Sequence, residues 1–425
     1  MGRQRDNGQD GEQREEQCGE QAGEPGGKRH GNPDRPRAIV IGGGIGGLTA
    51  ALALHSQGIP VRVHERADSL EPVGAGLALA PNALRSLDRL GVGERLRALA
   101  TPHPAVGLRH PSGRWLARTS TPVFEAYFGD TIAAVARADV IDTLLDALPE
   151  GTVRTGSPAT LVAPGGAAEP AVVRTADGEE EAALVVAADG IRSATRALLF
   201  PRHPGPRYSG FTTWRTVVTP GRLPAAAGEV WGRGELAGIV PLADGRVYVY
   251  GAALAPAGER AADGDERAEL LRRYGDWCAP VPQLFALAEP ERVLRHDVWD
   301  LADPLPAHHL GRVALLGDAA HAMCPFQGQG ACQAIEDAVV LASPLTPGTD
   351  PATTLPGYTA ARLPRTTAVV AGSRRIGDLV ALRSPAATLL RTTALTLAGL
   401  LPARVLLSRS APTYNWQPPA LGGVG

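Results

Sequence analysis

Lysine is nearly absent from this chain. Lys28 is the only one, and arginine supplies the rest of the 42 basic side chains. Residues 38–425 therefore offer no lysine for a Schiff base, a P-loop or other lysine-dependent chemistry. Cysteine is also scarce: the four residues Cys18, Cys278, Cys324 and Cys332 form neither a CxxC pair nor a metal-ligand spacing. These shortages predict no metal site and favour a reduced, cytoplasmic setting.

The chain also lacks a strong net charge and a long apolar run. A formal charge of −2 and a pI near 6.6 give no electrostatic reason to expect binding to nucleic acid or to an anionic membrane. The longest apolar stretch, residues 386–407, is interrupted by Arg391, Pro402 and Arg404. It falls short of a membrane span, so we expect no integral membrane segment. One or two buried or amphipathic helices fit this stretch, and a peripheral membrane contact is the alternative.

The order of apolar segments predicts how the chain is organised. Residues 1–37 contain almost no apolar side chains, so nothing offsets a backbone entropy cost of about 1–2 kcal/mol per residue, and we expect a disordered polar tail. A strand at 38–41, a helix at 47–57 and a strand at 61–65 then form a βαβ opening. A helix is expected over 81–100. Antiparallel strands are expected over 207–255, helices at 265–276 and 281–288, a returning strand at 313–317, and helix from 358 onward. This pattern predicts an α/β domain interrupted by a mostly β insertion, with a helical C-terminal segment.

A glycine-rich turn, Gly42-Gly43-Gly44-Ile45-Gly46-Gly47, follows the first strand. Gly42 permits the tight turn, Gly44 lets the backbone approach a pyrophosphate, and Gly47 allows close contact between helix and strand. Glu65, at the end of the next strand, is placed to accept hydrogen bonds from an adenosine ribose. The motif predicts dinucleotide binding and does not distinguish NAD from FAD.

Two later apolar runs also end in a glycine and an aspartate. Asp189-Gly190 precedes Ser193 and Arg196 at a helix start, a pattern that an ordinary turn would also give. Gly317-Asp318 precedes the turn at 328–330, which opens another helix. Glycines let the backbone approach a flat ring, and a helix N-terminus offers unpaired N–H groups with partial positive charge. We therefore expect Asp318 and this turn to bind a polar ligand at the carboxyl edge of a sheet.

In this order and spacing the motifs resemble the single-component (class A) FAD-dependent aromatic-ring monooxygenases, a family that includes para-hydroxybenzoate hydroxylase; the salicylate hydroxylase and zeaxanthin epoxidase types look most similar. The resemblance runs from about Ala38 to Trp416. It includes Gly74-Ala75-Gly76 followed by Pro81-Asn82-Ala83, Arg137 at a helix start, Trp214-Arg215, Arg362 with Arg365, and a Trp-Gln-Pro-Pro ending.

The resemblance implies an α/β fold: a Rossmann-like FAD-binding domain with an inserted, mostly antiparallel β substrate domain and a C-terminal helical segment. The FAD-binding domain would comprise residues 38–205 and 292–345, with 74–120 partly contributing to the substrate domain. The substrate domain would comprise residues 206–291, and the helical region residues 346–425.

The resemblance also implies which residues hold FAD. The ADP half would be bound by Gly42, Gly44, Gly46, Gly47, Glu65 and Arg66. The remaining cofactor contacts would come from Arg137, Asp189, Gly190, Gly317, Asp318, Gly328, Gly330 and Ala331. Asp189 and Gly190 would also serve NADH or NADPH, the reductant. For Arg137, a solvated arginine at a helix start is the alternative.

Arg215 and Pro325 are the expected catalytic residues. Pro325 would border the isoalloxazine, and Arg215 would either pair with a substrate carboxylate or phenolate or brace the flavin. His321 would be structural rather than a base. Ala322 and Cys324 stand where the family commonly has proline, so we expect the loop 322–327 to shape the substrate-facing surface.

The activity implied is that of an FAD-dependent monooxygenase. It would use NAD(P)H and O₂ to hydroxylate or epoxidise a small aromatic or alkene substrate, such as a natural product, through a flavin C4a-hydroperoxide. An FAD-dependent dehydrogenase or oxidase on the same fold is the alternative, and a non-catalytic FAD- or NAD-binding regulator is a third hypothesis. We expect a small-molecule substrate, no nucleic-acid partner, and a monomer or homodimer.

Overall fold

The computed structural model describes residues 37–70, 76–100, 105–222 and 227–422. Except for Arg37, the polar tail predicted at 1–37 lies outside these residues, and so does the Gly74-Ala75 pair of the family resemblance. The described residues form one compact unit, so the boundaries predicted between domains stay a prediction.

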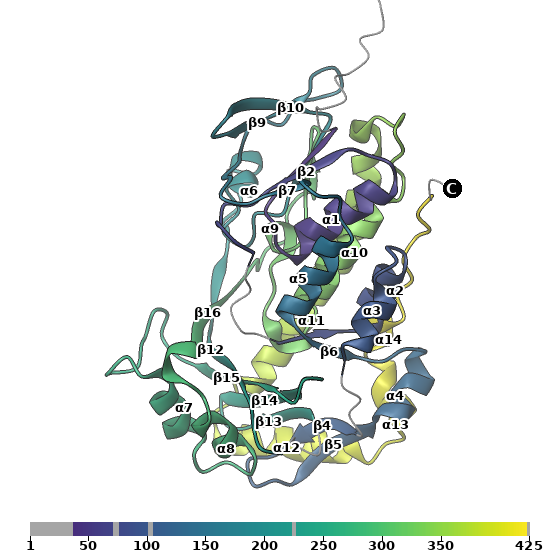
Figure 1. Cartoon of the computed structure of the whole chain (residues 1–425). Coiled ribbons are helices and arrows are strands. Elements are labelled where there is room, and N and C mark those ends of the chain that lie inside the picture. The colour runs from purple at the N-terminus through teal and green to yellow at the C-terminus, as the bar shows by residue number, and fades with distance from the viewer. Residues whose placement is uncertain (1–36, 71–75, 101–104, 223–226, 423–425) are drawn as a thin grey trace, which may run out of the picture. The chain divides into compact units, whose positions relative to one another are not determined.

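A six-stranded sheet in the order β17-β18-β11-β1-β2-β7 carries the first glycine-rich turn; two of its strands, β2 and β7, are labelled in Figure 1. Its neighbouring strands are parallel except at the β17 edge. The strands are β1 (Ala38–Ile41), β2 (Val61–His64), β7 (Val153–Arg154), β11 (Leu184–Ala187), β17 (His309–Leu310) and β18 (Val313–Leu315).

Both faces of this sheet are covered, as expected for parallel strands. Successive side chains of a strand point to opposite faces, so Val40 joins one core and Ile39 another. The first core includes helices α1 (Ile45–Ser56), α5 (Arg137–Asp146) and α10 (Gly330–Ala342). The second includes helix α6 (Ala194–Leu199) and a three-stranded antiparallel sheet of β8 (Thr160–Ala163), β9 (Ala171–Thr175) and β10 (Gly178–Ala182).

A seven-stranded, mostly antiparallel sheet has the order β16-β12-β15-β14-β13-β4-β5. Its strands are β4 (Ala105–Arg109), β5 (Trp115–Ser120), β12 (Arg207–Val218), β13 (Ala227–Trp231), β14 (Glu235–Pro241), β15 (Val247–Leu254) and β16 (Leu294–Asp300). One face, which includes Trp214 and Val249, packs on α7 (Glu266–Tyr274) and α8 (Val281–Ala286). The opposite face, with Phe211 and Trp231, packs with Cys324 and Phe326; we call it the inner face.

Helix α11 (Pro351–Val380) bridges the two large sheets. The Tyr358 hydroxyl donates to the carbonyl of Leu315 in β18 at 2.9 Å, and the Gly234 N–H, just before β14, donates to the carbonyl of Val380 at 3.1 Å. The other elements are strands β3 (Gly76–Leu79) and β6 (Ala133–Ala136), α-helices α2 (Pro81–Asp88), α3 (Gly93–Ala98), α4 (Thr121–Phe128), α9 (Asp318–His321), α12 (Pro385–Gly399), α13 (Ala403–Ser408) and α14 (Ala411–Tyr414), and 3-10 helices η1 (Pro290–Arg292) and η2 (Pro325–Gln327).

The predicted fold class is confirmed, with corrections to individual elements. The helix expected over 81–100 is two helices, because Gly91 adopts a left-handed φ of 75° between them. The C-terminal helical segment begins at Pro351 rather than near 358, with Asp350 capping it through a bond from the Ala352 N–H. Within the described ranges, no helix combines the length and apolarity needed to cross a membrane.

Candidate functional site

The three strand-end motifs lie at one edge of the six-stranded sheet. β1, β11 and β18 are neighbouring parallel strands, so the segments that follow them leave the sheet at the same edge. Gly42 packs so closely on the β11 end that a Cβ there would be 2.4 Å from the Ala188 carbonyl oxygen. A Cβ on Gly46 would be 2.7 Å from Leu316, next to Gly317. The structure therefore brings together three motifs that are far apart in the sequence.

The glycines of these motifs fall into two groups. Gly47 permits close packing, because a Cβ there would be 1.9 Å from the Gly42 carbonyl oxygen, and Gly42 itself has a φ of 107°. By contrast, a Cβ added at Gly44, Gly190, Gly328 or Gly330 would have no atom within 4 Å. The first group is needed for the protein's own packing. The second borders open space, which suits close approach of a ligand.

Glu65 lies directly against the glycine-rich turn. Its Oε2 accepts a hydrogen bond from the Gly43 N–H at 2.6 Å, and its Oε1 accepts one from the Ala67 N–H at 2.9 Å. The carboxylate is thereby fixed between the first turn and the end of β2. Arg66 beside it is exposed.

Asp189 has one satisfied and one unsatisfied oxygen. Its Oδ2 accepts a bond from the Thr195 N–H at 3.1 Å, while its Oδ1 is buried without a hydrogen-bond partner in the described part of the chain. Buried polar atoms are normally paired, so this oxygen is suited to a ligand donor. Arg196 joins this turn to the next, donating to the carbonyls of Ile191 at 2.6 Å and Ala319 at 3.0 Å.

Arg137 lies near both Asp318 and Arg215. Asp318 is solvent-exposed, and the desolvation that the surrounding protein nevertheless imposes raises the pKa of its carboxyl, although His321, Arg137 and Arg196 oppose this shift. Desolvation and then the charge of Arg215 lower the pKa of Arg137. Among the described residues, Arg137 makes no recorded hydrogen bond or ion pair, and the Nε of Arg215 is buried without a partner. The space beside Arg137, Arg215 and Asp318, which we call the Arg137–Asp318 corner, can therefore receive an anionic group.

Helix α10 points an uncapped N-terminus into the Gly328–Gly330 turn. It starts at Gly330, one residue before Ala331, and no side chain of the described residues caps its first turn. Helix α1 starts at Ile45 in the same way, without a side-chain cap or an acidic residue in its first turn. Uncapped N–H groups at helix starts bind phosphates and other anions.

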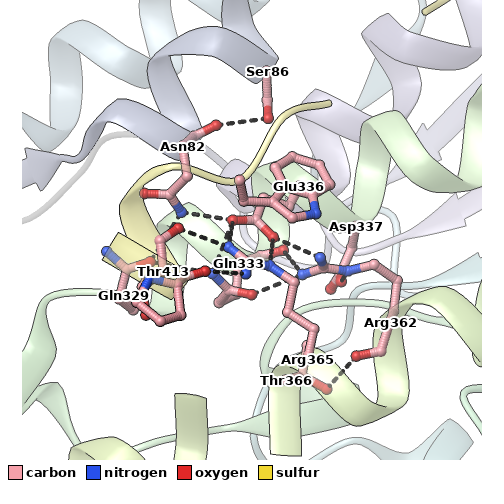
Figure 2. Close-up of polar contacts among 12 residues, drawn as sticks. Asn82, Ser86, Gln329, Gln333, Glu336, Asp337, Arg362, Arg365, Thr366 and Thr413 are labelled. Atoms are coloured by element: carbon pink, nitrogen blue, oxygen red, sulfur yellow. Dashed lines mark hydrogen bonds and ion pairs between the residues drawn. The ribbon is translucent and has the colours of Figure 1, made fainter. Parts of the chain in front are cut away.

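A buried ionic network holds α10 in place (Figure 2). Arg362 of α11 pairs with Glu336 at 2.5 Å and with Asp337 at 2.6 Å. Arg365 makes a second pair with Glu336 at 2.6 Å, and Asn82 of α2 donates to Glu336 at 2.6 Å. Asp337 also accepts from the Gly317 N–H at 2.9 Å. The network thus fixes the turn that carries Asp318.

Sequence reasoning missed the two carboxylates of this network. In the sequence, Arg362 and Arg365 are only markers of the family resemblance, and Glu336 and Asp337 belong to a predicted helix without an assigned role. The signal in the sequence is the pair Glu336-Asp337 in an otherwise apolar stretch, Ala334 to Leu341; such a pair requires buried partners if the helix packs on both sides.

His321 binds Asp337 rather than facing a substrate. Its Nε2 lies 2.5 Å from Asp337 Oδ2, and the residue is buried, which agrees with the structural role expected for it. Its ring centroid lies 5.7 Å from that of His308, which is also buried.

The burial of His308 leads us to expect that the folded protein is less stable in mild acid. Burial, followed by the influence of His321, lowers the pKa of His308 from 6.5 to about 3. Below pH 6.5 the unfolded chain binds a proton here that the folded chain does not, so stability falls as the pH falls through this window. We expect about 2 kcal/mol of this loss between pH 7.5 and 5 to come from His308. Urea unfolding of His308→Leu at both pH values should show a correspondingly flatter dependence; an unchanged slope would contradict the assignment.

The loop 322–327 buries the two residues that stand where the family commonly has proline. Ala322 is 1% exposed and Cys324 is 3% exposed, with the Cys324 thiol 3.4 Å from Asp300 Oδ2. Both side chains point into the protein, so they would affect the substrate-facing surface through the shape of the loop, and the expectation for the loop 322–327 stays a prediction. Pro325, at the start of η2, is exposed.

A polar row crosses the inner face of the seven-stranded sheet. The register aligns Arg215 of β12, Tyr250 of β15, Gly238 of β14 and Glu229 of β13. A Cβ on Gly238 would be 2.0 Å from the Tyr250 ring, so only glycine lets this ring cross β14. The Tyr250 hydroxyl then donates to Glu229 at 2.7 Å, and Trp231 Nε1 donates to the same carboxylate at 2.8 Å. Burial raises the pKa of Glu229, and the two donors oppose the shift.

An apolar pocket of about 420 Å³ adjoins the Glu229 end of this row. It extends from β4, β5 and β13 to α4, α13 and α14. Its lining includes Leu108, Phe124, Ile132, Leu406, Leu407 and Trp231. Ile132 immediately precedes β6, whose other end leads into Arg137, so one short strand connects the pocket wall to the Arg137–Asp318 corner.

Comparison with known proteins gives consistent matches over most of the chain. A family model described as an FAD binding domain matches residues 36–373. The chain is 38% identical over 344 residues to an aurachin C monooxygenase/isomerase of Stigmatella aurantiaca, covering 80% of this chain and 88% of that protein. It is 34% identical to an FAD-dependent urate hydroxylase of Klebsiella pneumoniae, covering 81% and 90%. The structure of Klebsiella pneumoniae HpxO complexed with FAD and uric acid matches with a TM-score of 0.81 at 30% identity, covering 89% and 96%.

Proposed function

Since this chain belongs to the FAD binding domain family, we propose that it is an FAD-dependent monooxygenase that uses NADH or NADPH and O₂ to hydroxylate or epoxidise a small organic substrate. The family resemblance inferred from the three motifs is confirmed. The observation that carries the proposal is the group of glycines at 44, 190, 328 and 330 that border open space at one sheet edge. Relatives that match over most of their length are monooxygenases and hydroxylases by name.

The residues at this edge fit FAD as a cofactor. The uncapped start of α1, with Gly44, would hold the pyrophosphate, and Glu65 would accept from the adenosine ribose. The unpaired Asp189 Oδ1 and the Asp318 carboxylate would accept hydrogen bonds from cofactor hydroxyls, and the uncapped start of α10 would face the flavin ring. Bound FAD would supply the redox chemistry, accepting reducing equivalents from NAD(P)H and activating O₂. The remaining predicted cofactor residues, among them Arg66 and Arg137, belong to the same proposal.

The inner face of the seven-stranded sheet would hold the substrate. Arg215 lies close enough to Arg137 for their charges to interact, and Tyr250 and Glu229 continue the polar row away from that corner. We propose that Arg215 orients a polar or anionic group of the substrate. The apolar pocket beside Glu229 would bind a hydrophobic substituent of the same substrate. Pro325, exposed at the start of η2, would border the reacting ring. The protein's contribution would be to orient the substrate and exclude water.

Labelled oxygen tests the proposal directly. The purified, FAD-loaded protein is tested for NADH and NADPH oxidation against a panel of phenols, heteroaromatic compounds and terpenoids that differ in the length of an apolar substituent. We expect some of these to accelerate flavin reduction and to yield a product that contains one oxygen atom from ¹⁸O₂. Product formation without NAD(P)H, accompanied by stoichiometric peroxide, would instead establish the oxidase alternative. A protein that binds no flavin would refute both.

The cytoplasmic location and the monomeric or dimeric state expected from the sequence stay predictions. Both can be examined with the same preparation, by fractionation of the producing cell and by light scattering.

A further inference from the structure

Helices α12 and α13 expose an unusual amount of apolar surface. Half of the exposed large apolar side chains among the described residues lie in this short segment: Leu389, Leu390, Leu397, Leu400, Leu401 and Val405. Four of them, Leu389, Leu390, Leu397 and Leu400, are 60–78% exposed, more than any other large apolar side chain in the described ranges. We call these six residues the leucine face. Large apolar patches on a protein surface usually mark a binding surface.

The polarity of α12 is reversed relative to a surface helix. Thr388, Arg391 and Thr392 are its buried residues, while Leu389 and Leu390 point outward. The Arg391 guanidinium donates to the carbonyls of Gly232 at 2.6 Å and Leu379 at 2.8 Å and lies over the Trp231 ring. The orientation is therefore fixed by buried contacts. A helix that faces water normally presents the opposite arrangement.

Positive charge accompanies the leucine face. Residues 379–425 contain four arginines and no aspartate or glutamate. Arg383, Arg404 and Arg409 are exposed. Helix α4, which contacts α13, adds exposed Val123 and a single carboxylate, Glu125. Although the net charge of the whole chain is −2, this part of the surface is therefore both cationic and apolar.

We propose that the leucine face of α12 and α13 rests on an anionic lipid surface, with its leucines among the acyl chains and Arg383, Arg404 and Arg409 at the headgroups. An exposed apolar face flanked by arginines is the pattern of helices that lie in a membrane interface. Residues 1–36 contain too few apolar side chains to cover this face. In a two-fold interface with a second copy, the same arginines would be brought toward one another, which is unfavourable.

Vesicle sedimentation tests the proposal with the FAD-loaded full-length protein. We expect binding to vesicles of phosphatidylcholine with about one third phosphatidylglycerol, weaker binding to phosphatidylcholine alone, and loss of the difference at high salt. The double variant Leu390→Ser/Leu400→Ser should bind at least about tenfold less. Each of Arg404→Gln and Arg409→Gln should weaken binding to the anionic vesicles about fivefold.

A matched control uses two exposed leucines elsewhere. Leu198 and Leu287 are 50% and 51% exposed, so Leu198→Ser/Leu287→Ser should bind vesicles as the wild type does. Failure of the wild type to bind either vesicle would overturn the proposal. Light scattering that shows a dimer, dissociated by Leu390→Ser/Leu400→Ser while vesicle binding is unchanged, would assign the face to a second copy instead. Neither result depends on the proposed oxygenation.

Discussion

Replacing Arg362 with methionine is expected to lower the free energy of unfolding by about 3–5 kcal/mol, the range for breaking a buried ion pair by removing one partner. Arg362 is fully buried and bridges Glu336 and Asp337. Burial would raise the pKa of Asp337, but His321 and Arg362 outweigh it and hold that pKa below its usual range. Methionine fills a similar volume and donates no hydrogen bond, so both carboxylates would be left with fewer partners. Urea unfolding followed by circular dichroism measures the change.

Two other arginines provide a graded comparison. Arg365 shares Glu336 with Arg362 but its side chain is 14% exposed, so Arg365→Met should cost less. Arg95 pairs with Asp146 at the surface, where both side chains are more than half exposed, and Arg95→Met should change stability by at most about 1 kcal/mol. A loss at Arg362 no larger than that at Arg95 would show that the buried network does not stabilise the fold.

Replacing Gly44 with valine is expected to leave the fold intact and to weaken FAD binding about a hundredfold or more, equivalent to about 2.7 kcal/mol. Gly44 has a φ of −71°, which any residue can adopt, and a Cβ there would have no atom within 4 Å. A valine side chain can therefore be accommodated by the protein alone. It would occupy the space assigned to the pyrophosphate and block close approach to the start of α1. The flavin retained after gel filtration measures the effect.

Gly357→Val and Gly47→Val are the comparisons for this variant. A Cβ at Gly357, an exposed residue of α11, also has open space, so this variant should fold and retain flavin as the wild type does. Gly47→Val should disrupt folding itself, since the added Cβ would lie 1.9 Å from the Gly42 carbonyl oxygen. Full flavin content in Gly44→Val would refute the assignment of the first turn to the cofactor.

The helices, strands and turns that are marked by a short, continuous pattern of residues could be predicted from the sequence. Gly42 to Gly47, Asp189-Gly190 and Gly317-Asp318 each combine an apolar run with glycines, and a parallel βαβ arrangement brings such strand ends to one edge. The strands at 207–255 were located from their apolar segments. Hydrophobic periodicity locates an element without giving its partner, so the same reasoning could not align Arg215 with Tyr250.

The parts that could not be predicted depend on packing between distant segments. The partner of Glu229 is Tyr250, two strands away, and the contact requires Gly238 on the intervening strand. No spacing in the sequence encodes that arrangement. The loop that carries Ala322 and Cys324 adjoins the expected flavin site, yet both side chains are buried, and the Cys324 thiol contacts Asp300. Likewise, the reversed polarity of α12 is visible only once the Arg391 contacts are known.

Helix α11 has a consequence for how this protein can move. It is 30 residues long, about 45 Å at 1.5 Å per residue, and is attached to Leu315 near one end and to Gly234 at the other. A helix attached at both ends, even with Pro356 and Pro364 inside it, opposes the hinge bending by which many two-domain enzymes open and close. Ligand entry and exit should then rely on local displacement of loops and of the short helix α13, on a nanosecond-to-microsecond timescale, rather than on rotation of one sheet against the other.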